Sequence, residues 1–477
     1  MDFPDRLVTR IRMAFGADPS ADPSTWEWTD VTERRQAQSI TISRGRQNEG
    51  AQAQPGSITI TLDNLDGALT PDNPTSPYFP HVIEGVPLEF SLQWEDVWYG
   101  RFAGEVSSYE PDWPYGDLSN ANANGYEGEA RVIVTANGIM RRLGQGSKPL
   151  KDALRRHVDA HGPLTYWPLT DGETAIQGTE VTGNGAPLRS VGTAGSFFQG
   201  QPNWGKGQAA SWLDPVVELP AQTTGYVTAT MSPRTITAWS IDHIVNSRGP
   251  GNITTLEVYD TGAQSATEPR VQWEIDEWGS GGFNEVQVRI VERLESSSST
   301  AILATISDPG IYDGGVHHLR LTVADDGAGG VTWELFIDGA SAADGTRTTD
   351  FRPLEQVVFR WSLIDPGNGV PTESVPFGHL TYWGDNAPAA IDTWRAVQGH
   401  VRELAGRRIE RLCAEQAVPL MVNGNLDGTP PMGPQLPGSF LELLQTAVEV
   451  DGGVLYEARE APRLEYRTLR SKYNQGL

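Results

Sequence analysis

DGGVHHLRLTV at residues 313–323 and WELFIDG at residues 333–339 decide the fold of the middle of this chain. Apolar and polar side chains alternate along each stretch. Successive side chains of a β-strand point to opposite faces, so each stretch predicts a strand with one buried face. The Asp338-Gly339 pair is typical of a tight turn between antiparallel strands. The two stretches therefore predict an antiparallel pair closed by an Asp-Gly turn.

Similar patterns recur on both sides of this pair. Strand-like runs at residues 235–241, 271–275 and 286–291 lie between turns rich in Gly and Asp. Many short strands at such spacing are typical of a β-sandwich. The sequence therefore predicts a sandwich domain over residues 163–388.

The first segment, residues 1–148, is also predicted to consist of strands. Alternating runs occur at residues 7–13, 39–43, 57–62, 86–94, 98–106 and 131–135. Loops rich in Asn, Asp, Gly and Pro separate these runs. Residues 107–128 are polar and rich in Gly and Asn, which predicts a surface loop.

Helical patterns flank the predicted sandwich. Residues 149–162 predict a connecting helix that ends at Gly162-Pro163. The last segment, residues 389–477, predicts a helix over residues 390–416 and a second helix over residues 439–450.

The end of the chain is predicted to be α+β. Ser439 is the expected N-cap of the second helix, and Gly452-Gly453 is its stop. Residues 454–458 and 463–467 are expected to form a hairpin. The predicted fold class is therefore mainly β and multidomain, with a small α+β segment at the end.

Charge limits the partners of the chain. It has 61 acidic and 36 basic residues, for a net charge of −25. A protein that binds duplex DNA needs a basic footprint, and none is visible overall. No nucleic-acid partner is therefore expected, and an acidic surface would suit a conduit along which DNA slides without sticking.

The chain has one cysteine, Cys413. An intrachain disulfide or a cysteine-based zinc site is therefore excluded, and a helical pattern makes Cys413 an expected small buried side chain. The first 15 residues lack the apolar run of a signal peptide, and no run approaches the ~18 residues of a membrane span. A soluble protein made in a cytoplasm is expected.

Two other stretches carry a family resemblance. The first runs from Ile42-Ser43-Arg44-Gly45-Arg46-Gln47-Asn48-Glu49 through residues 56–67 to Thr70-Pro71-Asp72-Asn73 and Ser76-Pro77-Tyr78. The second runs from Asp451-Gly452-Gly453-Val454-Leu455-Tyr456 to Ser471-Lys472-Tyr473-Asn474. Both resemble minor tail proteins of bacteriophages that infect actinobacteria.

This resemblance implies a tail hub or distal-tail protein with a β-barrel-type first domain. Such proteins form rings that continue the tail tube and carry the adsorption apparatus. The implied partners are further copies of the chain and the tail-tube, distal-tail and tape-measure proteins. A trimer is favoured over a hexamer, because large insertions fit more easily around fewer copies. The implied location is the tail tip of the virion.

The middle segment has a different resemblance. Residues 313–323 and 333–339, with Tyr166-Trp167-Pro168-Leu169 and residues 235–239, are similar to laminin-G-like, concanavalin-type jelly rolls. Val316 departs from that family, which often has Trp at this position. Folds of this family often hold a structural Ca²⁺ ion, but the sequence does not assign its ligands.

One strand has the pattern of a glycosidase. In Trp273-Glu274-Ile275-Asp276-Glu277, alternation places Glu274 and Asp276 on one face. Retaining hydrolysis needs a second catalytic carboxyl about 5–5.5 Å away. The second carboxyl would have to lie one or two positions further along the strand, where Trp278 and Gly279 stand. Glu277 points to the other face. An exposed acidic strand is therefore the favoured interpretation.

Other motifs are incomplete. Residues 200–207 (GQPNWGKG) nearly match a Walker loop, but Gly207 replaces the Mg²⁺-binding Ser or Thr, and a strand at residues 209–213 is expected where a helix is needed. His157 and His161 share a helix face but lack a third zinc ligand. His317 and His318 are adjacent on a strand, so they face opposite sides. No catalytic, cofactor-binding or metal-binding residue is assigned.

The leading hypothesis is a structural, non-enzymatic minor tail protein of a phage tail tip, hub or baseplate, which connects the tail tube to the adsorption apparatus. The alternative is a carbohydrate-binding adsorption protein that recognises a host surface glycan. Candidate glycan contacts are Trp204, Trp212 and Trp278, although packing within the domain explains a Trp equally well. A cell-wall-degrading tail enzyme is least favoured, because no complete catalytic site is visible.

Overall fold

The computed structural model describes residues 8–18, 21–35, 40–46, 52–113, 130–145, 148–191, 198–247, 252–280, 283–364 and 372–473. The chain forms two compact units. Unit 1 comprises residues 1–149, 403–432 and 438–477, and unit 2 comprises residues 150–402 and 433–437. The surface loop predicted at 107–128 is wrong for residues 107–112, which continue a strand, and it lies outside the described residues from position 114 on. Gln47, Asn48, Glu49 and Asn474 of the tail-like stretches also lie outside the described residues.

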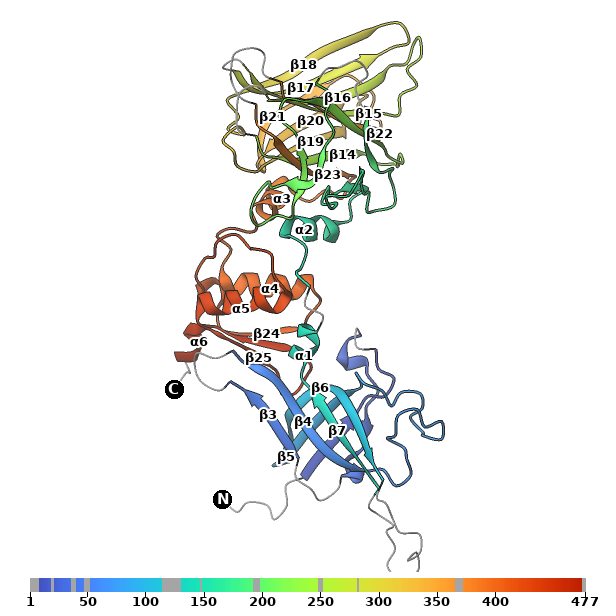
Figure 1. Ribbon diagram of the computed structural model, residues 1–477, viewed down its shortest axis with the longest axis vertical. Helices are drawn as coiled ribbons and strands as arrows, with labels where there is room; N and C mark the ends of the chain where they lie inside the picture. Colours follow the sequence, from blue (N-terminus) through green and yellow to red (C-terminus); the bar gives the residue numbers. More distant parts are fainter. Residues whose placement is uncertain are drawn as a thin grey trace, which may run out of the picture. The chain divides into compact units, whose positions relative to one another are not determined.

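Unit 1 begins with an antiparallel sheet, of which β3 to β7 are labelled in Figure 1. Its seven strands have the order β2-β1-β5-β6-β7-β4-β3. These strands are β1 (Val8–Met13), β2 (Thr29–Asp30), β3 (Thr41–Gly45), β4 (Gln54–Asp63), β5 (Pro87–Trp94), β6 (Val97–Asp112) and β7 (Arg131–Asn137). A β-bridge between Arg35 and Leu62 joins the chain beyond β2 to β4, so the sheet curls round on itself. Alternating side chains such as Ile58, Ile60 and Val134 fill its interior.

The rest of unit 1 comes mainly from the end of the chain. It comprises α1 (Ile139–Gly144), α4 (Ala405–Glu415), β24 (Leu420–Asn423), α5 (Phe440–Asp451), β25 (Val454–Glu457), β26 (Leu464–Arg467) and α6 (Leu469–Tyr473). The three strands form a sheet in the order β24-β26-β25, with α4 and α5 side by side next to it (Figure 1). Ser439 and Glu442 form a capping box on α5, and Gly452, with φ of 71°, ends the helix, as predicted.

The continuous helix predicted over residues 390–416 is wrong. Two helices occur instead: α3 (Ala390–Val397), in unit 2, and α4, in unit 1. Between them, Gly399, His400 and Arg402 have φ angles of 59°, 53° and 66°. A left-handed backbone cannot continue a right-handed helix, so the helical pattern is interrupted at these residues.

Unit 2 is a sandwich of two eight-stranded sheets. Sheet I has the order β18-β17-β16-β15-β22-β13-β10-β9, and sheet II has the order β11-β12-β23-β14-β19-β20-β21, with β8 also paired to β23. Sheet I contains β9 (Gln177–Gly178), β10 (Leu188–Val191), β13 (Thr224–Thr230), β15 (Asn252–Asp260), β16 (Arg270–Ser280), β17 (Phe283–Arg293), β18 (Ser298–Ser307) and β22 (Leu354–Ser362). Sheet II contains β8 (Thr165–Trp167), β11 (Asn203–Gly207), β12 (Val216–Leu219), β14 (Ala238–Val245), β19 (His317–Asp325), β20 (Val331–Ile337), β21 (Ala340–Arg347) and β23 (Val375–Trp383).

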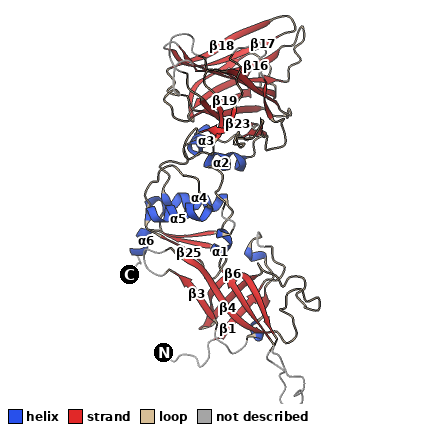
Figure 2. Ribbon diagram, viewed as in Figure 1, coloured by secondary structure: helices blue, strands red, loops and turns tan. Residues whose placement is uncertain are grey.

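The core of the sandwich is rich in aromatic rings. Trp239 and Trp273 meet edge to face at 6.1 Å between ring centroids, and Phe359 stacks on Phe377 at 3.7 Å. The stretches that opened the sequence analysis form β19 and β20, paired in register from Leu319–Ile337 onward. The Asp338-Gly339 turn, however, joins β20 to β21, so the prediction that it closes this pair is wrong. The mainly β, multidomain fold class is confirmed, and strands predominate throughout (Figure 2).

Two helices cover part of sheet II. The predicted connecting helix is α2 (Ala153–His161), which belongs to unit 2 and contacts α3. Leu154 and Val158 of α2 pack with Val397 of α3 in one buried cluster. Within the described residues, no helix combines the length and the apolar character needed to cross a membrane.

Candidate functional site

The three tryptophans proposed as glycan contacts lie in different environments. Trp204 is only 7% exposed and belongs to the sandwich core, so it has no open ring face, and the expectation for it is wrong. Its segment is strand β11, which turns the ring inward. Trp212 is half-buried beside the α2–α3 cluster and donates its indole N–H to the carbonyl of Val397 at 2.8 Å. Trp278 lies on β16 and is 42% exposed.

The acidic strand is neither exposed nor isolated. Glu274 and Asp276 lie on the same face of β16, as predicted, but both are buried. Arg289 of β17 contacts both carboxylates at 2.9 Å. Because burial outweighs this attraction, the pKa values of Glu274 and Asp276 are raised.

A second carboxylate does lie beside Glu274. It is Glu257, which is directly opposite Glu274 across the β15–β16 pair. The sequence argument considered only later positions on the same strand and missed it. Glu257 is buried, ion-paired with Arg360 at 2.5 Å, and accepts the Tyr259 hydroxyl hydrogen bond at 2.6 Å. Each carboxylate is thus held by an arginine and removed from solvent, which does not suit a nucleophile.

The near-Walker stretch is not a phosphate loop. Residues 203–207 are strand β11, paired with β12, and no helix follows. The strand predicted at residues 209–213 is also wrong, because these residues form a turn.

The histidines have structural contacts. His161 Nδ1 lies 2.8 Å from the His157 carbonyl oxygen, and His157 Nε2 lies 3.3 Å from the Thr393 hydroxyl. His317 lies between Asp313 and Asp338, whereas His318 faces Asp242, so adjacent histidines do point to opposite sides. Among the described residues, no group of three or more His, Cys, Asp or Glu side chains could hold a metal ion, so the Ca²⁺ implied by the jelly-roll resemblance finds no such group there.

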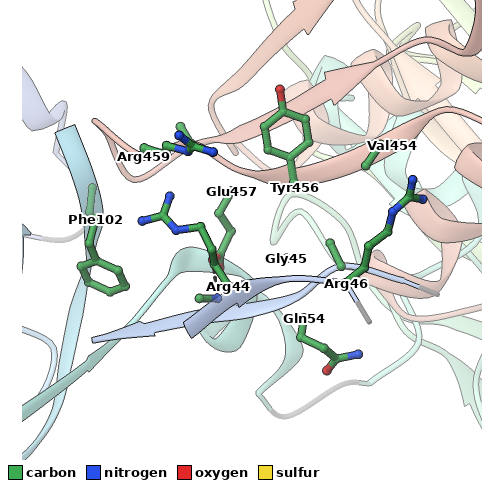
Figure 3. A pocket seen from close by; sticks show the side chains of 13 residues that line it. Arg44, Gly45, Arg46, Gln54, Phe102, Val454, Tyr456, Glu457 and Arg459 are labelled. Carbon is green, nitrogen blue, oxygen red and sulfur yellow. Dashed lines mark hydrogen bonds between the residues drawn. The ribbon is translucent and has the colours of Figure 1, made fainter. Parts of the chain in front are cut away.

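A pocket in unit 1 is the best-defined candidate site. Its cavity measures about 210 Å³ and lies between the β3–β4 hairpin and β25 (Figure 3). The lining residues are Arg44, Gly45, Arg46, Ala53, Gln54, Gly56, Phe102, Ala103, Val454, Tyr456, Glu457, Ala458 and Arg459. Three arginines therefore surround a mainly apolar hollow that has one carboxylate in its wall.

The carboxylate of Glu457 links the C-terminal part of unit 1 to its N-terminal sheet by hydrogen bonds. Glu457 accepts hydrogen bonds from the backbone N–H of Gly56 at 2.6 Å and of Met140 at 2.7 Å. The Gly56 N–H is available because the β3–β4 register shifts between Ser43 and Gly45, which leaves an extra residue on β4. Burial raises the pKa of Glu457, although both N–H groups and Arg44 act in the opposite direction.

The arginines of the pocket repel one another. In Figure 3, Arg44 extends from β3 towards Arg459, beside Glu457. Burial, followed by the charges of Arg459 and Arg101, lowers the pKa of Arg44 despite the nearby Glu457. Among the described residues, neither Arg44 nor Arg459 forms an ion pair, although Glu457 attracts Arg44. The pocket can therefore attract an anion.

Comparisons with known proteins give little further guidance. No family model and no curated protein matches this chain. Among solved structures, it is similar to the botulinum neurotoxin type G receptor-binding domain, at 9% identity and a TM-score of 0.30, over 51% of this chain and 53% of that chain. It is also similar to the ligand-binding domain of botulinum neurotoxin serotype D in complex with N-acetylneuraminic acid, at 8% identity and a TM-score of 0.31, over 53% and 54% of the two chains. The chain thus matches only about half the length of these proteins, and so low a similarity carries no functional argument.

Proposed function

We propose that this chain is a non-enzymatic structural protein of a bacteriophage tail tip, with unit 1 as its scaffold and the sandwich as an inserted module. One observation carries the proposal. The two stretches that resemble phage minor tail proteins begin at residues 42 and 451, yet both belong to unit 1. Glu457 of the second stretch bonds to Gly56 of the first, 401 residues earlier. The sandwich, with its different resemblance, lies between them in sequence. This is the organisation expected of a tail scaffold that has acquired an extra domain.

The location can be tested directly by electron microscopy. In particles of a phage that encodes this chain, gold-labelled antibodies against the purified protein should mark the tail end distal to the capsid. Label on the capsid, or protein present only in the particle-free fraction of a lysate, would contradict the proposal.

The protein is proposed to have no hydrolytic activity. Glu274→Gln and Glu257→Gln should leave the rate of polysaccharide hydrolysis at the buffer background, because both carboxylates are already paired with arginines. Release of reducing sugar and loss of turbidity of host cell walls are the measurements. Hydrolysis by the unmodified chain that disappears in either variant would establish an enzyme instead.

A second candidate function is glycan binding by the sandwich. The observation that favours it is the exposed ring of Trp278 on the outward face of sheet I, directly opposite the half-buried Glu285 of β17. Sugars bind where an aromatic ring lies beside hydrogen-bonding side chains, and an aromatic contact contributes about 0.5–1.5 kcal/mol beyond its buried area. Such a ring would explain recognition of a host surface glycan.

Trp278→Ala should therefore weaken binding to a bacterial glycan array by roughly tenfold, which corresponds to about 1.4 kcal/mol. The control is Ile302→Ala, because Ile302 is 59% exposed on β18 of the same sheet. Equal binding by the two variants would exclude Trp278 as a contact.

A further inference from the structure

In the arginine pocket, lined by Arg44, Arg46 and Arg459, neither Arg44 nor Arg459 forms an ion pair with a described carboxylate, although Glu457 attracts Arg44. Arg44 and Arg459 both line the cavity, and both are exposed at its rim. The carboxylate of Glu457 is already occupied by two backbone N–H groups, and no other described carboxylate forms an ion pair with Arg44 or Arg459. An anion placed between these guanidinium groups would relieve their mutual repulsion.

The lining indicates that the anion is part of a peptide. Phe102, Val454, Tyr456 and Ala458 make most of the wall apolar. A free inorganic anion gains nothing from such a wall, whereas a peptide with acidic and aromatic side chains can use both features. In addition, β3 and β25 are each the last of the described strands in their sheet, so each presents a strand edge without a described neighbour. An extended peptide can bind along such an edge.

One segment of this chain has that chemistry. Residues 110–129, EPDWPYGDLSNANANGYEGE, contain five acidic and no basic residues, together with one Trp and two Tyr. Its described beginning is exposed: Glu110 and Asp112 lie at the end of β6, and Trp113 is 49% exposed. The segment therefore complements the pocket in both charge and apolar character.

The geometry of β4 places the two points where the segment joins the sheet, Asp112 and Arg131, at the opposite end of the curled sheet from the pocket. Gln54, at the start of β4, lines the pocket, whereas Asp63, at its end, pairs with Arg131, where the segment returns to the sheet. Nine residues at about 3.3 Å each separate these ends by roughly 30 Å.

The segment is too short to bind in the pocket of its own copy. The chain leaves the sheet at Asp112 and returns at Arg131, which is its direct partner. A loop anchored at one place can extend by only half its length, here about nine residues or roughly 32 Å when fully stretched. Reaching the pocket of the same copy would leave no residues to bind in it.

We propose that the arginine pocket of one copy binds the acidic segment 110–129 of a second copy. Because the segment joins the curled sheet at the opposite end from the pocket, the contact is head to tail. Repeated contacts of this kind close into a ring when the rotation between copies permits. Such binding does not require a tail-tip location, so this proposal and the proposed function can fail separately.

A labelled synthetic peptide of residues 110–129 is the probe, and fluorescence anisotropy with the full-length chain is the measurement. Binding should be saturable and should weaken as salt screens the charges. Arg44→Glu combined with Arg459→Glu should reduce the affinity at least tenfold. The matched control is Lys206→Glu with Arg402→Glu, which changes the net charge equally at two exposed residues of unit 2 and should leave the affinity unchanged.

Two further measurements test whether the peptide contact also occurs between two full-length copies of the chain. Full-length chain should self-associate in sedimentation velocity, and the Arg44→Glu, Arg459→Glu variant should not. A chain that carries all four substitutions, Arg44→Glu, Arg459→Glu, Asp117→Lys and Glu127→Lys, should self-associate again, because both of its contact surfaces then have reversed charge.

Four results would overturn the proposal. They are no saturable peptide binding, equal binding to the Arg44→Glu, Arg459→Glu variant, equal binding of a scrambled peptide, and a full-length chain that stays monomeric although the peptide binds.

Discussion

Glu457→Ala should lower the free energy of unfolding of unit 1 by about 2–6 kcal/mol, with no change in the sandwich. The substitution removes the acceptor of the Gly56 and Met140 N–H groups, which lie in a part-buried setting. A buried donor left without a partner costs about 1–3 kcal/mol, and here two donors are affected. Hydrogen exchange followed by mass spectrometry should show lost protection in β4 and α1 and unchanged protection in sheets I and II.

Gly138→Ala provides a matched test from the opposite side of the same contact. A Cβ at Gly138 would overlap the carboxylate of Glu457, although the φ of Gly138, −70°, suits any residue. Gly138→Ala alone should therefore displace Glu457 and destabilise unit 1. In the Glu457→Ala background the clash is gone, so the second substitution should add little. Strictly additive effects would show that the two residues do not interact in this way.

Arg320→Met should destabilise the sandwich by about 3–5 kcal/mol. Arg320 donates two hydrogen bonds of 2.6 Å to the carboxylate of Asp242, and the side chains of both residues are at most 4% exposed. Removing the arginine leaves a buried carboxylate whose remaining partners among the described residues are the Trp383 indole N–H and His318. Chemical denaturation followed by far-ultraviolet circular dichroism measures the loss.

Two controls show whether burial of the charge causes this effect. Arg395→Met breaks an exposed pair with Asp392 and should change stability by less than about 1 kcal/mol. Asp242→Leu combined with Arg320→Met removes both charges and should recover much of the loss. A double variant as unstable as Arg320→Met alone would refute the explanation.

The stability that the Asp242–Arg320 pair contributes to the sandwich should fall as the pH is lowered. Burial opposes ionisation of Asp242, but Arg320 and His318 together hold its pKa below the ordinary value. A depressed folded-state pKa contributes stability that is complete above the ordinary Asp value of about 3.9 and is lost as the pH falls towards the folded value. Acid unfolding of the sandwich should therefore be less steep in Asp242→Leu/Arg320→Met than in the unmodified chain.

The strands were predictable from sequence where one face is buried. Alternation at residues 317–323 and 331–337 identified β19 and β20, because each has a buried face in the sandwich. The same alternation failed at Trp204, since the glycines around it resemble a loop. The helix break after residue 397 did leave one signal that the helical pattern overrode: Gly399 adopts the left-handed conformation that is common just after a helix, and His400 and Arg402 follow it without being Gly or Asn.

Local sequence patterns could not identify the candidate site. Glu457 bonds to backbone N–H groups, which every residue other than proline carries, so nothing in the composition marks its partners. Arg44 and Arg459 are 415 positions apart in the sequence and meet only in the folded unit. Glu257 was overlooked for a similar reason, since the neighbour of a strand residue depends on which strands pair and in what register.

The bond between Glu457 and Met140 also fixes an order of events during synthesis. These residues are 317 positions apart, and a ribosome adds about 5–20 residues per second. The first strands of unit 1 therefore wait roughly 15–60 s before the residue that completes their hydrogen bonding is made. Throughout that time, water satisfies the Gly56 and Met140 donors, and the sheet of unit 1 lacks its C-terminal layer. The last strand of the sandwich ends at residue 383, so the inserted domain can finish folding on the ribosome before the unit that carries it.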